Sequence, residues 1–170
     1  MAHEEPPDVE ADFRRFHEAE HASIVAWLCC LGFSHHIAEE AAHEALEQLY
    51  WSWLHVHTNK RMWVRTTAKR IATRHAKAER GLLTKLVRNG FRPPSDHDSG
   101  VGEVVERHGD LVQAVNSLPE RQRVPFALHL EGFTAKEIAA ELDIPERTAH
   151  HRISRARTTL RAMFAPGEEK

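Results

Sequence analysis

The sequence contains only two cysteines, and no apolar run in it approaches the length of a membrane-spanning helix. Cys29 and Cys30 are adjacent, so they provide neither a disulfide framework nor the spaced ligands of a metal site. We expect two buried free thiols without a function. The first twelve residues are acidic and include two prolines, which is unlike a signal peptide. These absences predict a cytoplasmic protein that makes no membrane contact.

Net positive charge is also lacking, because the 170 residues carry a formal charge of −2. The charge is unevenly distributed, however. Residues 1–12 contain five acidic residues and no Lys or Arg, whereas residues 13–92 contain 13 Lys and Arg against 7 Asp and Glu. Residues 93–114 are acidic again, and residues 115–170 are almost balanced. Positive charge is therefore concentrated in one part of the chain, as a protein that contacts phosphates requires.

The stretch from Thr134 to Arg157 predicts two short helices separated by a tight turn. Thr134 and Glu137 have the spacing of a capping box, which marks a helix start. Pro145 interrupts the pattern and suits the first turn of the next helix. Apolar residues recur every three or four positions and should be buried: Ala135, Ile138, Ala139 and Leu142 in the first helix, and Ala149, Ile153, Ala156, Leu160 and Met163 in the second.

The opposite face of the second helix is cationic and rich in hydrogen-bond donors. Two helices with such a face form a helix-turn-helix, in which the second helix enters the major groove and reads base edges with its first turns. The predicted base-edge contacts are Arg147, His150, His151 and Ser154, with Thr148 beside them. The predicted phosphate contacts are Arg152, Arg155 and Arg157. A solvated amphipathic helix in an ordinary helical bundle is the alternative.

Three helices are predicted upstream. The first covers residues 13–31 and ends at Gly32. The second covers residues 34–53 and has an alanine-rich buried stripe opposite an acidic face, which would suit a basic partner. The third, over residues 61–80, should direct a row of cations outward: Arg65, Lys69, Arg70, Arg74, Lys77 and Arg80. The segment between the second and third helices is rich in aromatic and polar residues, which suggests base stacking.

Two groups of residues match metal-site patterns. His17, Glu18 and His21 have the H-E-x-x-H spacing of zinc hydrolases, and His36, Glu40 and His43 share one helix face. Neither group has a further ligand that the sequence reveals. We therefore expect solvated helix faces, no metal, no cofactor and no enzymatic activity.

The helical pattern fades between residues 81 and 108, where glycine, proline, serine and aspartate gather. Beyond it we expect a helix that ends near Asn116 and another that begins at Pro119, with Val124, Phe126, Ala127 and Leu130 in its core stripe. The sequence thus predicts an all-α fold of two small helical domains: an acidic flexible tail at 1–12, a first domain at 13–80, a flexible linker at 81–108 and a helix-turn-helix domain at 109–170.

Several of these segments together resemble bacterial RNA polymerase sigma factors, especially the extracytoplasmic-function (ECF) group. LPERQR from Leu118, the run EGFTAKEIAAEL and the final SRARTTL match the promoter-binding C-terminal domain of that family. AEEAAHEALEQLY, from Ala38, is similar to the acidic helix of the other ECF domain, and Trp63 stands at the tryptophan that opens the basic helix. The resemblance spans about Phe13 to Phe164.

The resemblance implies a two-domain factor that binds core RNA polymerase and directs promoter-specific initiation without catalysis. It implies that the acidic helix docks on the beta-prime coiled coil through Glu40, His43 and Glu44. It assigns recognition and melting of the minus-10 element to Trp51, Trp53, His55, His57 and Asn59 in the loop, and to Arg65, Lys69, Arg70, Arg74 and Lys77 on the basic helix. The helix from Pro145 would read the minus-35 element, and its domain would contact the beta flap. Anti-sigma factors are common partners in the family.

The sequence departs from the family at several functional positions. Arg70 and Arg74 stand where Asn and Asp are usual, His43 replaces a common Gln, and Ala149 replaces a common Val. These departures concern promoter sequence and melting more than the fold. Two alternatives stay open: a stand-alone helix-turn-helix regulator that binds duplex DNA as a dimer, and a zinc hydrolase at His17 and His21.

Overall fold

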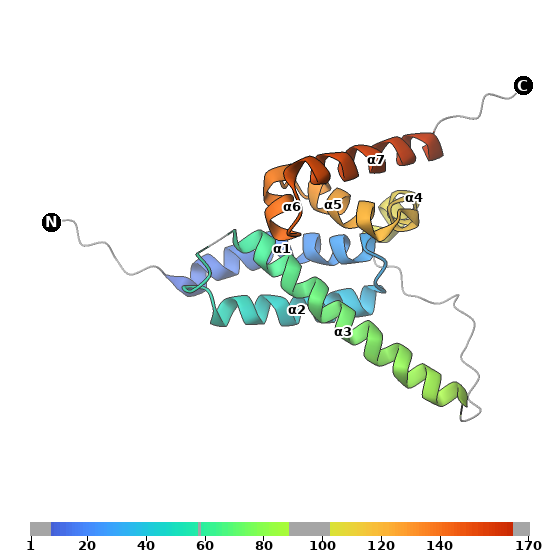
Figure 1. Ribbon diagram of the computed structural model, residues 1–170. Helices are drawn as coiled ribbons and strands as arrows, with labels where there is room; N and C mark the ends of the chain where they lie inside the picture. The colour runs from blue at the N-terminus through green and yellow to red at the C-terminus, as the bar shows by residue number, and fades with distance from the viewer. Residues whose placement is uncertain (1–7, 58, 89–102, 165–170) are drawn as a thin grey trace, which may run out of the picture. The chain divides into compact units, whose positions relative to one another are not determined.

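The computed structural model describes residues 8–57, 59–88 and 103–164, and these residues form seven α-helices and no strand (Figure 1). The predicted all-α fold is therefore confirmed. Most of the predicted acidic tail and the middle of the predicted linker lie outside the described residues. None of the described helices is long and apolar enough to span a membrane.

The chain divides into two compact units. The first comprises residues 1–25 and 34–100, and the second comprises residues 26–33 and 101–170. Within the first unit, α2 (His35–Trp51) packs along α3 (Lys60–Arg88). The N-terminal part of α1 (Val9–Cys30) belongs to the same unit.

The alanine-rich stripe of α2 forms the centre of the first unit. Ala38, Ala41, Ala42 and Ala45 are completely buried, and Leu49 is buried with them. Because alanine side chains are small, they allow α3 to approach closely with Val64, Ala68 and Ile71. The start of α2 follows a local signal: the Ser34 hydroxyl accepts a hydrogen bond from the Ile37 amide at 3.4 Å, as an N-cap residue does.

Helix α3 is longer than the sequence pattern predicts. We expected it to end at Arg80 and the next helix to begin near residue 109, but α3 continues to Arg88 and α4 runs from Glu103 to Ser117. The extra turns of α3 are exposed from Lys77 to Lys85, and no atom outside the local helix lies within 4 Å of where a Cβ on Gly81 would be. Residues 77–85 of the helix are all exposed, so no buried stripe marks how far the helix continues.

The second unit contains α5 (Glu120–Leu130), α6 (Ala135–Glu141) and α7 (Glu146–Phe164), which pack together, with α4 contacting α5 and α7 (Figure 1). Most of the predicted stripe residues are buried, including Val124, Phe126, Ile138 and Ile153. Ala135 and Leu142 are only half-buried, and two predictions were wrong: Leu130 is 52% exposed and Met163 is 50% exposed. Both lie at or next to the C-terminal end of a helix, where the helical period continues but the packing partner does not.

Candidate polymerase and nucleic-acid interfaces

The helix-turn-helix of the second unit begins with the predicted capping box. The Thr134 hydroxyl accepts from the Glu137 amide at 3.2 Å, and the Glu137 carboxylate accepts from the Thr134 amide at 2.9 Å. Two amides that the start of α6 would leave unpaired are thereby satisfied. Asp143 then adopts a left-handed conformation with φ 49°, and the Ile144 amide donates to the Ala139 carbonyl at 3.0 Å. This turn reverses the chain between α6 and α7.

Helix α7 buries one face and exposes another. Ala149, Ile153, Ala156 and Leu160 are buried against α5 and α6, as predicted. The predicted DNA-facing side chains lie on the remaining surface: Arg147, His150, His151, Ser154, Arg155 and Arg157 are exposed, and Thr148 and Arg152 are half-buried. These exposed side chains could therefore contact DNA if the first turns of α7 entered its major groove.

Two of these residues have polar neighbours within the same unit. His150 Nε2 lies 3.7 Å from the Glu146 carboxylate, one turn earlier on the same helix. The Arg157 guanidinium contacts His129 Nε2 on α5. Arg147 and Arg155, which are both exposed, therefore present the plainest cationic surface of α7.

In the first unit, the aromatic residues at the end of α2 and just beyond it differ in exposure. Trp51 is the last residue of α2 and is 73% exposed, and His55 and His57 are exposed beyond it. Trp53 is half-buried, with its ring edge-on to Phe13 and Phe16 of α1 at centroid distances of 5.6 and 5.4 Å. The Lys60 ammonium lies 5.0 Å from the Trp53 ring centroid. Trp51 therefore offers a face for stacking, whereas Trp53 holds α1 against the start of α3.

Asn59, another predicted contact in this loop, helps to start α3. Its side-chain oxygen accepts from the Met62 amide at 3.3 Å. Its remaining side-chain surface is exposed.

The predicted outward orientation of Arg65 is wrong, because its side chain is 0% exposed. Its Nη1 donates to Glu20 Oε2 at 2.9 Å and to the Arg61 carbonyl at 3.2 Å, and its Nη2 donates to the Ser23 hydroxyl at 2.8 Å. Glu20 and Ser23 belong to α1, 45 and 42 residues away in the sequence. Arg65 thus pairs α3 with α1, and this role explains why a cation is buried there.

The other cations of α3 lie elsewhere around the helix. Arg70 and Lys77 are exposed, and Lys69 is half-buried. Arg74 is also exposed, but its Nη2 donates to Glu44 Oε1 on α2 at 2.6 Å. Arg70, Arg74 and Lys77 follow at i, i+4 and i+7, so they share one face of α3. That face is the cationic surface of the first unit.

The predicted polymerase-docking residues lie along α2. His43 and Glu40 are exposed, with 64% and 51% of their side chains accessible, and Glu44 is half-buried. Glu40 and Glu44 also lie 3.5 and 3.3 Å from the ring nitrogens of His75 on α3. These three residues border an open groove of about 980 Å³, whose lining includes Phe13 and Trp51.

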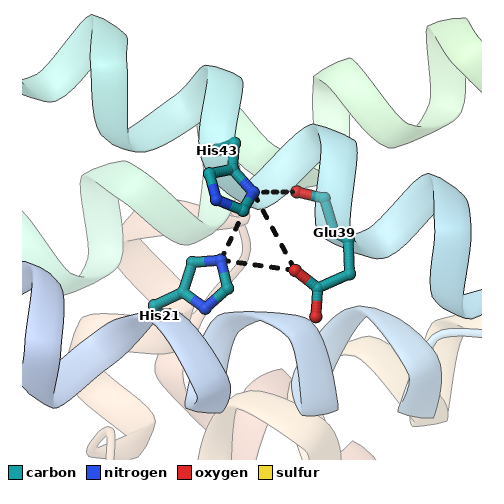
Figure 2. A group of neighbouring side chains, drawn as sticks. All are labelled: His21, Glu39 and His43. Atoms are coloured by element: carbon teal, nitrogen blue, oxygen red, sulfur yellow. Dashed lines mark hydrogen bonds and ion pairs between the residues drawn. The ribbon is translucent and has the colours of Figure 1, made fainter. Parts of the chain in front are cut away.

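A histidine cluster that the sequence pattern did not predict lies at the edge of this groove (Figure 2). His21 of α1 meets Glu39 and His43 of α2, with all the donor atoms within 4.8 Å of one another. Residues of both sequence motifs therefore meet here: His21, on which His17 is stacked, lies beside Glu39 and His43 of α2. The motif's glutamate, Glu18, is exposed. In the sequence, the one sign of this cluster was the i, i+4 spacing of Glu39 and His43.

Comparison with known proteins identifies the C-terminal part of the chain. Residues 108–160 match the family model described as Sigma-70, region 4. This range contains α5 and α6 and most of α7, so the helix-turn-helix is similar to that of sigma-70 region 4.

The fold of the chain as a whole matches that of a sigma factor. A crystal structure of the sigma factor RpoE in complex with the anti-sigma factor NepR from Bartonella quintana aligns with a TM-score of 0.65 and 21% sequence identity. The match covers 92% of this chain and 99% of that one. No curated protein matches the sequence. At this identity the likeness to RpoE concerns the fold.

Proposed function

We propose that this protein is an ECF-type sigma factor that binds core RNA polymerase and directs promoter-specific transcription initiation. The observation that carries the proposal is the combination in one chain of a region 4 helix-turn-helix with a fold like that of RpoE over 92% of the length. The exposed residues support it, since both units present cationic helix faces and neither presents an assembled catalytic site among the described residues. The protein would act in the cytoplasm, where its polymerase and promoter are found.

The first turns of α7 would read the minus-35 element. Arg147, His150, His151 and Ser154 are exposed and lie where a recognition helix contacts base edges. Thr148, Arg152, Arg155 and Arg157 would contact the backbone or the flanks of the site. The same domain would contact the beta flap of the polymerase.

The first unit would dock on the polymerase and recognise the minus-10 element. Trp51 has an open ring face for an unstacked base, and His55, His57 and Asn59 follow it. Arg70 and Lys77 would contact phosphates, with Lys69 beside them, and Arg74 would do so on leaving its pair with Glu44. Residues 13–80 would carry these functions, and residues 81–108, which include the last turns of α3, would connect them to the minus-35 domain.

The acidic surface of α2 would be the polymerase-docking surface. Glu40, His43 and Glu44 would face the beta-prime coiled coil beside the groove that they border. RpoE was crystallised with NepR, and we extend this to propose an anti-sigma factor as a further partner of the present chain.

Transcription by purified core polymerase with and without the protein tests the proposal. We expect new transcripts from a genomic promoter library only when both are present, with start sites that share two spaced upstream elements. Duplex binding by the protein alone, as a dimer and without new start sites, would instead establish a stand-alone regulator.

The roles of the two interfaces can then be separated with matched variants. Arg147→Ala should relax selection at the upstream element by about 5- to 150-fold, because a good base contact discriminates by about 1–3 kcal/mol. Arg161→Ala is the control, since Arg161 is exposed on α7 beyond the predicted contacts. Equal losses in the two variants would refute the assignment of Arg147 to base readout.

Promoter opening is tested at Arg70. Arg70→Ala should weaken transcription from a duplex promoter more than from one that is already melted, with Arg80→Ala as an exposed control on the same helix. The same loss on both templates would exclude a role of Arg70 in melting.

A further inference from the structure

We propose that His21, Glu39 and His43 form a binding site for a divalent transition metal, with Zn²⁺ the best match, on the surface of the first unit (Figure 2). The site joins α1, which carries His21, to α2, which carries the other two ligands one turn apart. Nothing in the proposed sigma activity requires such a site. Its test is therefore independent of transcription.

The distances between the donor atoms fit a tetrahedral metal. His21 Nε2 lies 3.4 Å from His43 Nδ1 and 3.4 Å from Glu39 Oε2, and His43 Nδ1 lies 3.9 Å from Glu39 Oε2. Ligands bound at about 2.0–2.1 Å to a tetrahedral Zn²⁺ are about 3.3–3.4 Å apart. Two of the three separations thus already match, and the third needs a shift of about 0.5 Å.

The donor set determines which metals fit. Two imidazoles and one carboxylate suit Zn²⁺ and its neighbours Co²⁺, Ni²⁺ and Cu²⁺, whereas Mg²⁺ and Ca²⁺ prefer oxygen ligands. Three protein ligands leave one position of a tetrahedron for water. A further imidazole, that of His17, is stacked on the ring of His21 at a centroid distance of 5.3 Å.

The surroundings hold the ligands in a suitable state. Burial lowers the pKa of His21, as do the neighbouring His43 and His17, against the opposing effect of the Glu39 carboxylate. The other oxygen of Glu39 lies 3.7 Å from His35 Nδ1, a neighbour that can orient the carboxylate as outer partners do in metal sites.

The hydrogen bonding around His43 competes with the metal. His43 Nδ1 lies 3.0 Å from the backbone carbonyl of Glu39. A metal bound at Nδ1 would displace a proton from this contact. A small rotation of the ring away from the carbonyl would free Nδ1 for the metal. With 64% of its side chain exposed, His43 has the freedom to turn.

Metal titration of the purified full chain tests the proposal. Any histidine affinity tag must be removed, because it would bind the added metal together with the chain's own 14 histidines. We expect one equivalent of Zn²⁺ to bind in competition with a chromophoric chelator, and one equivalent of Co²⁺ to give the visible absorption of a tetrahedral complex. Only weak binding with no defined stoichiometry would overturn the proposal.

Single substitutions locate the site. His21→Gln and His43→Gln should each lower the affinity by more than the ~10- to 100-fold that loss of an outer partner causes. His36→Gln is the matched control, because His36 is 76% exposed on α2 and pairs with Glu40 outside the cluster. Unchanged affinity in His21→Gln, or an equal loss in His36→Gln, would also overturn the proposal.

The position of the ligands on two helices provides a second readout. Zn²⁺ should raise the thermal unfolding midpoint of the wild-type protein and of His36→Gln, because a metal that joins α1 to α2 binds only the folded unit. It should leave the midpoints of His21→Gln and His43→Gln unchanged. Circular dichroism of the metal-free variants tests whether they fold; in a folded variant, a lost shift reports the lost ligand. An equal shift in all four proteins would contradict a site at this cluster.

Discussion

Replacing Arg65 should destabilise the first unit, because its buried guanidinium pairs with the carboxylate of Glu20 on another helix. The Arg65 side chain is 0% exposed and that of Glu20 is 12% exposed. Removing one partner of a buried ion pair costs about 3–5 kcal/mol, since the other charge stays buried. Arg61 Nε also contacts the Glu20 carboxylate, at 2.8 Å, and keeps it partly compensated. We therefore expect Arg65→Met to cost about 3 kcal/mol, at the lower end of this range.

Urea unfolding followed by tryptophan fluorescence measures this loss. All four tryptophans precede residue 64 in the sequence, so the signal reports the N-terminal part of the chain. With a typical dependence of about 1–3 kcal/mol per M urea, the midpoint should fall by about 1–3 M. Glu20→Gln should also lower the urea midpoint. The double variant should lose less stability than the sum of the losses in the two single variants.

Arg70→Met is the matched control for Arg65→Met. Arg70 lies on the same helix but is exposed, so its replacement should change the stability by less than about 0.5 kcal/mol. Equal midpoints for the two variants would refute the buried pair. Unchanged stability of Arg65→Met together with weakened promoter opening would restore Arg65 as a DNA contact.

Three further predictions concern single side chains. Thr134→Ala removes the cap of α6 and should cost about 1 kcal/mol of stability by circular dichroism; no loss would mean that the capping box contributes nothing. Ile153→Ala should cost about 2–5 kcal/mol, because Ile153 is buried in α7, whereas Met163→Ala, at a half-exposed position, should cost much less in the same assay. Burial raises the pKa of the Cys30 thiol to about 11, so only about one molecule in 1,000 carries the reactive thiolate at pH 8. Mass spectrometry should show slow alkylation of Cys30 in the native protein and rapid alkylation in urea; equal rates would contradict the raised pKa of this half-buried thiol.

The helix-turn-helix could be predicted from the sequence because its determinants are local. The capping box joins residues three apart, and Pro145 marks the start of the next helix. The buried stripe of α7 follows from the helical period alone. The signal is weaker at the ends of helices, and for that reason the predictions for Leu130 and Met163 were wrong.

The extent of α3 was not predicted because residues 77–85 are exposed and give no buried stripe that continues the helical pattern. Gly81 suggested a break, yet a glycine within a helix costs only about 1 kcal/mol relative to alanine. The helix therefore continues past it to Arg88. Composition alone did not distinguish an exposed helix from a linker.

The orientation of Arg65 could have been predicted from the period. Arg65 precedes Ala68 by three positions and Ala72 by seven, and both alanines are buried, so all three lie on one face of α3. Its residue type argued for the opposite orientation, because arginine is almost never buried without a partner. The partner, Glu20, lies 45 residues away, and no local pattern reveals it.

Arg65 and the histidine cluster both depend on contacts between helices, which sequence patterns do not reveal. In each, polar side chains of α1 meet residues of another helix: Glu20 meets Arg65, and His21 meets Glu39 and His43. A helical period tells which residues share a face of one helix, but not which faces meet. Arg65 is about 140° around α3 from Arg70. The same basic helix therefore carries a buried arginine that binds α1 and an exposed arginine on another face. The residues of α3 that we propose to contact nucleic acid are therefore on the exposed face of Arg70, Arg74 and Lys77.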